Sequence, residues 1–295
     1  MYLKKTYTAG ITKEVHNTYS ARYGKNISRG GNVNRTPEAV KNYNTKMAHR
    51  ELTRLINENY SPGDIHLVLT YFRGQRPGPK QAKKNLNAFL RKLRGYFKKQ
   101  KSELKYIAVT AFGDRGAIHH HLIINTMDGK DIRGMWPFGG SHVEYLYPDG
   151  EYSALAWYFI QQSRKSPAGE LTGKKRWTCS KNLKRPVPTV REVDAKTWRE
   201  PPKAEPGYII DVNSIDAGIN PISGIPYLFY RMILAQKRIV TPDGAVLRGQ
   251  EALEYQIREN RKAIQNEWEN HKTEKLKITN QGNCKKSNSR THRKR

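Results

Sequence analysis

The chain has 295 residues, of which 54 are Lys or Arg and 26 are Asp or Glu, so its formal net charge at pH 7 is +28. This excess predicts a polyanionic partner, and nucleic acid is the first candidate. No apolar run approaches the roughly 20 residues needed to cross a bilayer, the N-terminus lacks a signal-peptide core, and Cys179 and Cys284 fit no zinc spacing. We therefore expect a reduced cytoplasmic protein with no disulfides and no membrane partner.

Residues 1–62 are polar, basic and rich in Asn, Thr and Gly, and are interpreted as an N-terminal extension. A helix is predicted within it at 37–59, where a proline stands at the start and apolar residues recur along the segment. The stretch "SPGD" at 61–64 then marks a change of pattern.

Residues 63–186 carry the clearest alternation of strands and helices. The predicted elements are a buried strand at 64–72, an amphipathic helix at 81–97, strands at 104–112 and 117–125 joined by the turn "GDRG", a short strand at 141–147, a helix at 151–165 and a further strand at 174–182. This split β-α-β order predicts an α+β fold, with an antiparallel sheet of ferredoxin-like topology and helices packed on one face.

The C-terminal part has a weaker pattern. Residues 187–272 are proline-rich at first and then predict a long charged helix at 248–272, and residues 273–295 are interpreted as a disordered basic tail. The last eleven residues hold six basic side chains and no acidic one: Lys285, Lys286, Arg290, Arg293, Lys294 and Arg295. These are candidates for phosphate contacts, and the alternative is a tail that only keeps the protein in solution.

Three consecutive histidines stand in the predicted strand at 117–125, "AIHHHLIIN". Because successive strand residues point to opposite faces, His119 and His121 share one face, and His120 lies with Leu122 and Ile124 on the other. Two imidazoles spaced in this way can ligate one divalent ion. A bare His-x-His pair also occurs for structural reasons, so context has to decide between the two readings.

The order of motifs supplies that context, because it resembles the HUH endonucleases and in particular the rolling-circle replication initiators of plasmids, phages and related mobile elements. Their first motif, a strand of the F-L-T-L-T kind, is matched by "HLVLTY" (66–71), and their His-x-His motif by "GAIHHHLII" (116–124). Their tyrosine helix corresponds to "YFIQ" (158–161), and "RWTCSKNLKRP" (176–186) is similar to a segment that follows it.

Two positions depart from the family pattern. The Glu that usually supplies a third metal ligand is replaced by Ala111, which leaves Asp114 in the turn as the nearest carboxylate, or else a site of two histidines and water. The lysine after the motif tyrosine is replaced by Gln161, and Lys165, seven residues after Tyr158, lies on the same helical face and could take its place.

The resemblance implies that Tyr158 attacks a phosphodiester of single-stranded origin DNA, keeps the 5′ phosphate as a covalent ester and frees a 3′ hydroxyl that primes synthesis. It also implies a Mg²⁺ or Mn²⁺ cofactor at His119 and His121. Tyr152 is the second choice of nucleophile, followed by Tyr145 and Tyr147, and Tyr158 has packing beside Leu155 and Gln162 as its alternative role. The chain has no G-x-x-x-x-G-K-[ST] loop, so a separate host helicase and polymerase are expected partners.

Several other side chains are candidates for DNA contacts. Arg73, Arg76 and Lys80 follow the first strand, where a solvated loop is the alternative, and His66 could approach the site from that strand. Trp136, Phe138 and Trp157 could stack bases or pack in the core. Alternative functions are a relaxase or transposase with the same chemistry, a non-enzymatic nucleic-acid-binding protein that keeps the fold, and a basic RNA- or ribosome-associated protein.

Overall fold

The computed structural model describes residues 1–20, 37–113, 116–165, 176–194, 200–219 and 226–288, with the side chains of Ala39 and of residues 272–288 left aside. The chain forms two compact units. We call them the central unit (Thr8–Ile11 and Thr36–Val187) and the terminal unit (Met1–Tyr7, Thr12–Arg35 and Pro188–Arg295), and each is described by itself.

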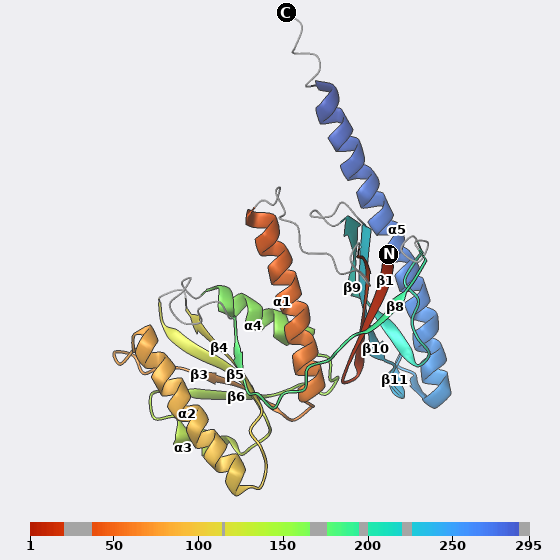
Figure 1. Ribbon diagram of the computed structural model, residues 1–295. Helices are drawn as coiled ribbons and strands as arrows, with labels where there is room; N and C mark the ends of the chain where they lie inside the picture. The colour runs from red at the N-terminus through yellow and green to blue at the C-terminus, as the bar shows by residue number, and fades with distance from the viewer. Residues whose placement is uncertain (21–36, 114–115, 166–175, 195–199, 220–225, 289–295) are drawn as a thin grey trace, which may run out of the picture. The chain divides into compact units, whose positions relative to one another are not determined.

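The central unit is built on a five-stranded antiparallel sheet (Figure 1). Its strands are β3 (Ile65–Leu69), β4 (Tyr106–Phe112), β5 (Ile118–Ile124), β6 (Ser141–Tyr145) and β7 (Thr178–Cys179), in the order β6-β3-β5-β4-β7. Because β5 lies between β3 and β4, the segment that runs from β3 through helix α2 (Pro79–Lys99) to β4 is a split β-α-β unit. The predicted α+β fold with an antiparallel sheet is therefore confirmed.

Helices cover both faces of this sheet, so the expectation that they pack on one face was wrong. Helices α2 and α3 (Gly129–Met135) cover one face, where Leu67 and Leu122 are fully buried. Helices α1 (Pro37–Asn59) and α4 (Ser153–Arg164) cover the other, against Val109 and Ile123. The physical reason is that β4 and β5 are apolar on both faces, and each face has to be removed from water.

Helix α1 has the predicted bounds, but it belongs to the central unit rather than to an extension. Its buried residues Leu52, Leu55 and Ile56 pack in the same cluster as α4. The Asn59 side chain closes the helix end, since it donates to the carbonyls of Leu55 (2.9 Å) and Lys184 (2.8 Å) and accepts from the Lys184 amide (2.8 Å). These bonds tie the end of α1 to the segment that follows β7.

The terminal unit joins the first residues of the chain to its last third. Its sheet contains β1 (Tyr2–Ala9), β2 (Thr12–Tyr19), β8 (Thr189–Glu192), β9 (Tyr208–Ile219) and β10 (Pro226–Leu234), in the order β8-β1-β2-β10-β9, and β11 (Arg238–Val240) pairs with β12 (Val246–Arg248). Ile264 and Trp268 of helix α5 (Gly249–Asn288) pack against buried residues of β2, β9 and β10. Residues 1–20 are thus two paired strands of a sheet, where a polar extension was expected.

Helix α5 continues beyond the predicted end at 272, so residues 273–288, expected to be disordered, are helical. Among the described residues, no helix is both long and apolar enough to cross a membrane.

Candidate functional site

Strand β5 presents its three histidines as the alternation of a strand requires. His120 lies on the α2 face, where its ring contacts Tyr71 and Trp136, and it is fully buried. Its Nδ1 is 2.8 Å from the Thr110 hydroxyl and its Nε2 is 3.0 Å from the Tyr71 hydroxyl. His120 is therefore a satisfied core residue, as the alternation predicted.

His119 and His121 share the opposite face, which α4 covers. Their ring centroids are 4.9 Å apart. Nδ1 of His119 lies 3.2 Å from the carbonyl oxygen of Ala117, so a proton on Nδ1 leaves the lone pair of Nε2 available to a ligand. Both ring nitrogens of His121 are buried and have no hydrogen-bond partner among the described residues. An imidazole in that condition is unusual, because a buried polar atom is normally paired.

A third histidine joins this pair from the neighbouring strand. β3 pairs with β5 so that Val68 faces His121 and His66 faces Ile123. The His66 ring stacks on that of His121 at 5.7 Å, and its buried Nε2 also has no partner among the described residues. Its Nδ1 is 3.2 Å from Oε2 of Glu144.

Glu144 is the carboxylate of this group and comes from the adjacent strand β6, where it pairs with His66. Its other oxygen, Oε1, accepts from Nε2 of the exposed His142 at 3.0 Å. The hydrogen bonds from His142 and His66 lower the pKa of Glu144, although burial opposes this shift. Glu144 is thus a carboxylate at neutral pH, and it fixes the orientation of His66.

Tyr158 of α4 lies over the histidines. Its ring is 5.1 Å from that of His121 and 6.0 Å from that of His66, and its side chain is 39% exposed, so it can reach a partner in solution. Burial and the nearby Glu144 raise the pKa of Tyr158, so its hydroxyl is protonated at neutral pH. The neighbouring Phe159 is fully buried and anchors the helix on the sheet.

The other two predicted catalytic residues lie along the same helix. Lys165 follows the last turn of α4 and is exposed, and its charge contributes to the lowered pKa of His121, which places it near the histidines. Gln161 is half-buried, and no contact joins it to His121 or Tyr158. Tyr152, the second choice of nucleophile, is fully buried, and its hydroxyl donates to the carbonyl of Tyr147 at 3.4 Å.

The protonation of the histidines suits ligands rather than cations. Burial, reinforced by His119 and His66, lowers the pKa of His121 to about 3. Burial also lowers the pKa of His66, against the opposing effect of Glu144. Both rings are therefore neutral at pH 7, which is the form that binds a metal ion.

The donor atoms fit a divalent ion at His119 and His121, because the orphaned nitrogens of His121 lack any other partner within the described residues. Among the residues that the structure describes, no group of three or more His, Cys, Asp and Glu side chains is arranged to surround an ion. Ala111, directly opposite His119 on β4, is fully buried and supplies no ligand. Asp114 lies outside the described residues, so its predicted role is not addressed. Two histidines with water is the arrangement that these residues allow.

The predicted DNA contacts are not brought to the histidines. Arg73 and Arg76 are exposed in the loop before α2, and Lys80 is exposed in the first turn of α2, the helix on the far face of the sheet. Lys285 and Lys286 fall in α5 with side chains that are not described, and Arg293, Lys294 and Arg295 lie outside the described residues. Trp136 is buried, whereas Trp157 is exposed and has its ring against His49.

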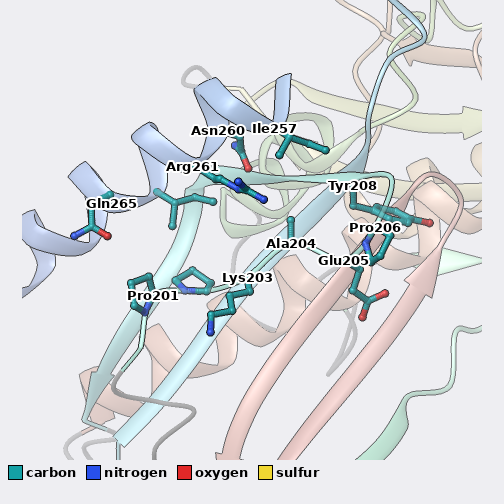
Figure 2. Close-up of a pocket in the computed structure, with 12 residues that line it drawn as sticks. Pro201, Lys203, Ala204, Glu205, Pro206, Tyr208, Ile257, Asn260, Arg261 and Gln265 are labelled. Atoms are coloured by element: carbon teal, nitrogen blue, oxygen red, sulfur yellow. The ribbon is translucent and has the colours of Figure 1, made fainter. Parts of the chain in front are cut away.

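A pocket of about 600 Å³ lies in the terminal unit, between the proline-rich segment 201–206 and α5 (Figure 2). Lys203, Arg261 and Gln265 are among its lining residues, and Glu205 forms an ion pair with Lys13. The lining contains no histidine or cysteine, so this pocket does not offer the ligand set found on β5.

Comparison with known proteins points to the same part of the chain. Residues 64–163 match a family model described as Replication-associated protein ORF2. No curated protein and no solved structure matches the chain. The matched segment is about one third of the sequence and contains β3, β5 and Tyr158 on α4. The central unit is therefore similar to proteins associated with replication.

Proposed function

We propose that the chain is a replication initiator that nicks and rejoins single-stranded DNA at an origin, with Tyr158 as nucleophile. The observation that carries the proposal is the position of Tyr158, whose ring lies against His121 and His66 and whose side chain remains accessible. Three segments far apart in sequence, on β3, β5 and α4, meet at this point. The family match over residues 64–163 supports a role in replication.

In the proposed reaction the Tyr158 oxygen attacks the phosphorus of a DNA phosphodiester. A bond forms between that oxygen and the phosphorus, the bond to the 3′ oxygen breaks, and the 3′ oxygen takes up a proton while the phenol loses one. The products are a 5′-phosphotyrosine and a free 3′ hydroxyl, and attack by that hydroxyl reverses the step and rejoins the strand. A bound Mg²⁺ or Mn²⁺ would supply Lewis-acid polarisation of the phosphate.

The residues around Tyr158 have separable roles. His119 and His121 would hold the ion, and the stacked His66 keeps the His121 ring in place. Glu144 positions His66 through its hydrogen bond to Nδ1. Lys165 places a positive charge near His121 and would offset the charge of the bound phosphate. The raised pKa of Tyr158 means that its hydroxyl has to be activated when DNA binds.

A second candidate function is a DNA-binding protein that keeps the fold without the chemistry. It is favoured by Ala111 and by the lack of a third ligand among the described residues. The same chemistry would also serve a relaxase or transposase. For an initiator, a separate helicase and polymerase of the host would carry out unwinding and synthesis.

A covalent-adduct assay separates these functions. The protein is incubated with Mn²⁺ and single-stranded DNA that tiles the genetic element encoding it, and is then denatured and sized. The proposal predicts a DNA-linked band that EDTA abolishes and that is absent from Tyr158→Phe, with the spectroscopically folded Tyr145→Phe protein as the matched control. DNA binding without an adduct anywhere in the element would favour the binding protein.

A further inference from the structure

The exposed side of helix α2 carries an unbroken basic surface. The helix, Pro79–Lys99, contains eight Lys and Arg residues and no Asp or Glu, and all eight are exposed. Five of them fall along one line on the side opposite the buried residues, at the i, i+3 and i+4 spacing that places residues above one another. We call this line the α2 stripe: Lys80, Lys84, Arg91, Arg94 and Lys98.

The α2 stripe is not explained by the packing of the central unit. The opposite side of α2 already buries Phe89, Leu90 and Leu93 against the sheet. Of the stripe residues, only Arg94 has a polar contact, a long one to the Tyr106 hydroxyl (3.4 Å), and none forms an ion pair within the described residues. Concentrating five cations without carboxylates raises the electrostatic energy of the folded protein, and a polyanion would relieve that repulsion.

The stripe lies on the other face of the sheet from the candidate active site. α2 packs on the layer formed by Leu67 and Leu122, whereas Tyr158 and His121 belong to the layer covered by α4 (Figure 1). The sheet stands between them, so the stripe does not contact the phosphate that Tyr158 attacks. It is a second surface with its own ligand.

The geometry of the stripe favours a duplex over a single strand. From Lys80 to Lys98 the helix rises about 27 Å, which is the length of about eight base pairs of B-form DNA. Proteins that bind unpaired strands add aromatic rings on which bases stack, but Phe89 and Phe97 of α2 are buried and Tyr96 is half-buried. Cations without accessible rings suit a phosphate backbone.

We propose that the α2 stripe binds the backbone of double-stranded DNA, so that this chain holds a duplex segment on one face of its sheet while Tyr158 acts on a single strand at the other. The inference rests on the proposed function in taking DNA as the partner, but it concerns a different surface. The contacts are to phosphates, so binding at the stripe is independent of base sequence and strongly dependent on salt.

The test compares two double variants of the full chain with the same change in charge. Lys84→Gln/Lys98→Gln removes two stripe residues, and Lys92→Gln/Lys99→Gln removes two exposed lysines that lie off the line on the same helix. Affinity for a random-sequence duplex is measured between about 50 and 200 mM salt, together with adduct formation on a single-stranded oligonucleotide. A structured RNA duplex is the second probe.

The stripe variant is expected to lose about tenfold in duplex affinity, and its slope of log K against log salt is expected to fall by about 2, close to 0.9 for each lost phosphate contact. The off-line variant is expected to lose less than about threefold, and both are expected to form the oligonucleotide adduct as the unaltered protein does. Equal losses in the two variants would overturn the proposal, as would a loss confined to RNA. A lost adduct with intact duplex binding would count against both the stripe and its separation from the site.

Discussion

Adjacent histidines of β5 lead to opposite expectations for the same substitution. His120 and His121 are both buried, at 0% and 2% exposure. His120 has hydrogen-bond partners for both ring nitrogens, whereas His121 has none within the described residues. If His121 is kept for a ligand, it should be a cost to the protein when no metal is bound. We therefore predict that His121→Leu stabilises the metal-free protein and that His120→Leu destabilises it.

The magnitudes follow from the cost of unpaired polar atoms. Leaving a buried donor or acceptor unsatisfied costs about 1–3 kcal/mol, and leucine removes the two such atoms of His121 while filling a similar volume. We expect His121→Leu to raise the free energy of unfolding by about 1–3 kcal/mol. His120→Leu instead takes a partner from the hydroxyls of Tyr71 and Thr110, and should lower that free energy by about 1–3 kcal/mol.

The assay is urea unfolding in EDTA at about pH 7.5, where the pKa values of about 3 keep both rings neutral. Repeating it with Mn²⁺ at about 100 times its dissociation constant should add about 2.7 kcal/mol to the unaltered protein. It should add nothing to His121→Leu. If His121→Leu is destabilised as much as His120→Leu in EDTA, then the nitrogens of His121 have partners in the fold, and the argument that they await a ligand is refuted.

Three further predictions concern pH, packing and the choice of nucleophile. Burial lowers the pKa of His120 from 6.5 to about 3, so between about pH 7.5 and pH 5 the unfolded chain takes up a proton that the folded chain does not, and the free energy of unfolding should fall by about 2 kcal/mol at this residue; urea titrations at the two pH values should show that difference in the unaltered protein relative to His120→Leu, and parallel curves would contradict the assignment. A methyl group on Gly139 would lie 2.2 Å from the carbonyl oxygen of Thr70 and 2.7 Å from Cα of Tyr71, so Gly139→Ala should lower the melting temperature through a cost of about 1–3 kcal/mol. Gly95→Ala, on α2 with open space around it, should raise the free energy of unfolding by up to about 1 kcal/mol, and a similar loss in both variants would show that the Gly139 contact is not the cause. Tyr152→Phe should keep the covalent adduct in the gel assay, because Tyr152 is fully buried with its hydroxyl bonded to Tyr147; loss of the adduct in a folded Tyr152→Phe protein would move the nucleophile there.

The sequence allowed the central sheet and the faces of its histidines to be predicted because those depend on local periodicity. Alternation within one strand is enough to separate His120 from His119 and His121. The spacing of Phe89, Leu90 and Leu93 likewise predicts α2 from a few turns of helix. These patterns need no knowledge of which strands pair.

The positions of His66 and Glu144 depend on strand register, and a single sequence does not give register. His66 reaches His121 only because β3 pairs with β5 with Val68 opposite His121. Glu144 reaches His66 because β6 is the other neighbour of β3. The strand assignment of 141–147 together with the polar residues in it was the one signal that could have pointed to Glu144.

Long-range pairing also explains what was missed in the rest of the chain. β2 lies between β1 and β10, strands from opposite ends of the sequence. Glu14 of β2 is buried within ion-pair distance of Arg231 of β10 at 3.6 Å. Neither charge reads as a core residue on its own, so residues 1–20 resemble a polar extension until the partner strand is known.

The most direct test of the central claim is the identity of the residue that becomes joined to DNA. Trypsin, which cuts after Lys and Arg, releases residues 134–164 as one peptide, and this peptide contains all four candidate tyrosines: Tyr145, Tyr147, Tyr152 and Tyr158. After nuclease trimming of the adduct, fragment-ion mass spectrometry locates the added nucleotide phosphate within the peptide. The account predicts that it is on Tyr158. A nucleotide on any other residue, or an adduct outside residues 134–164, would contradict it.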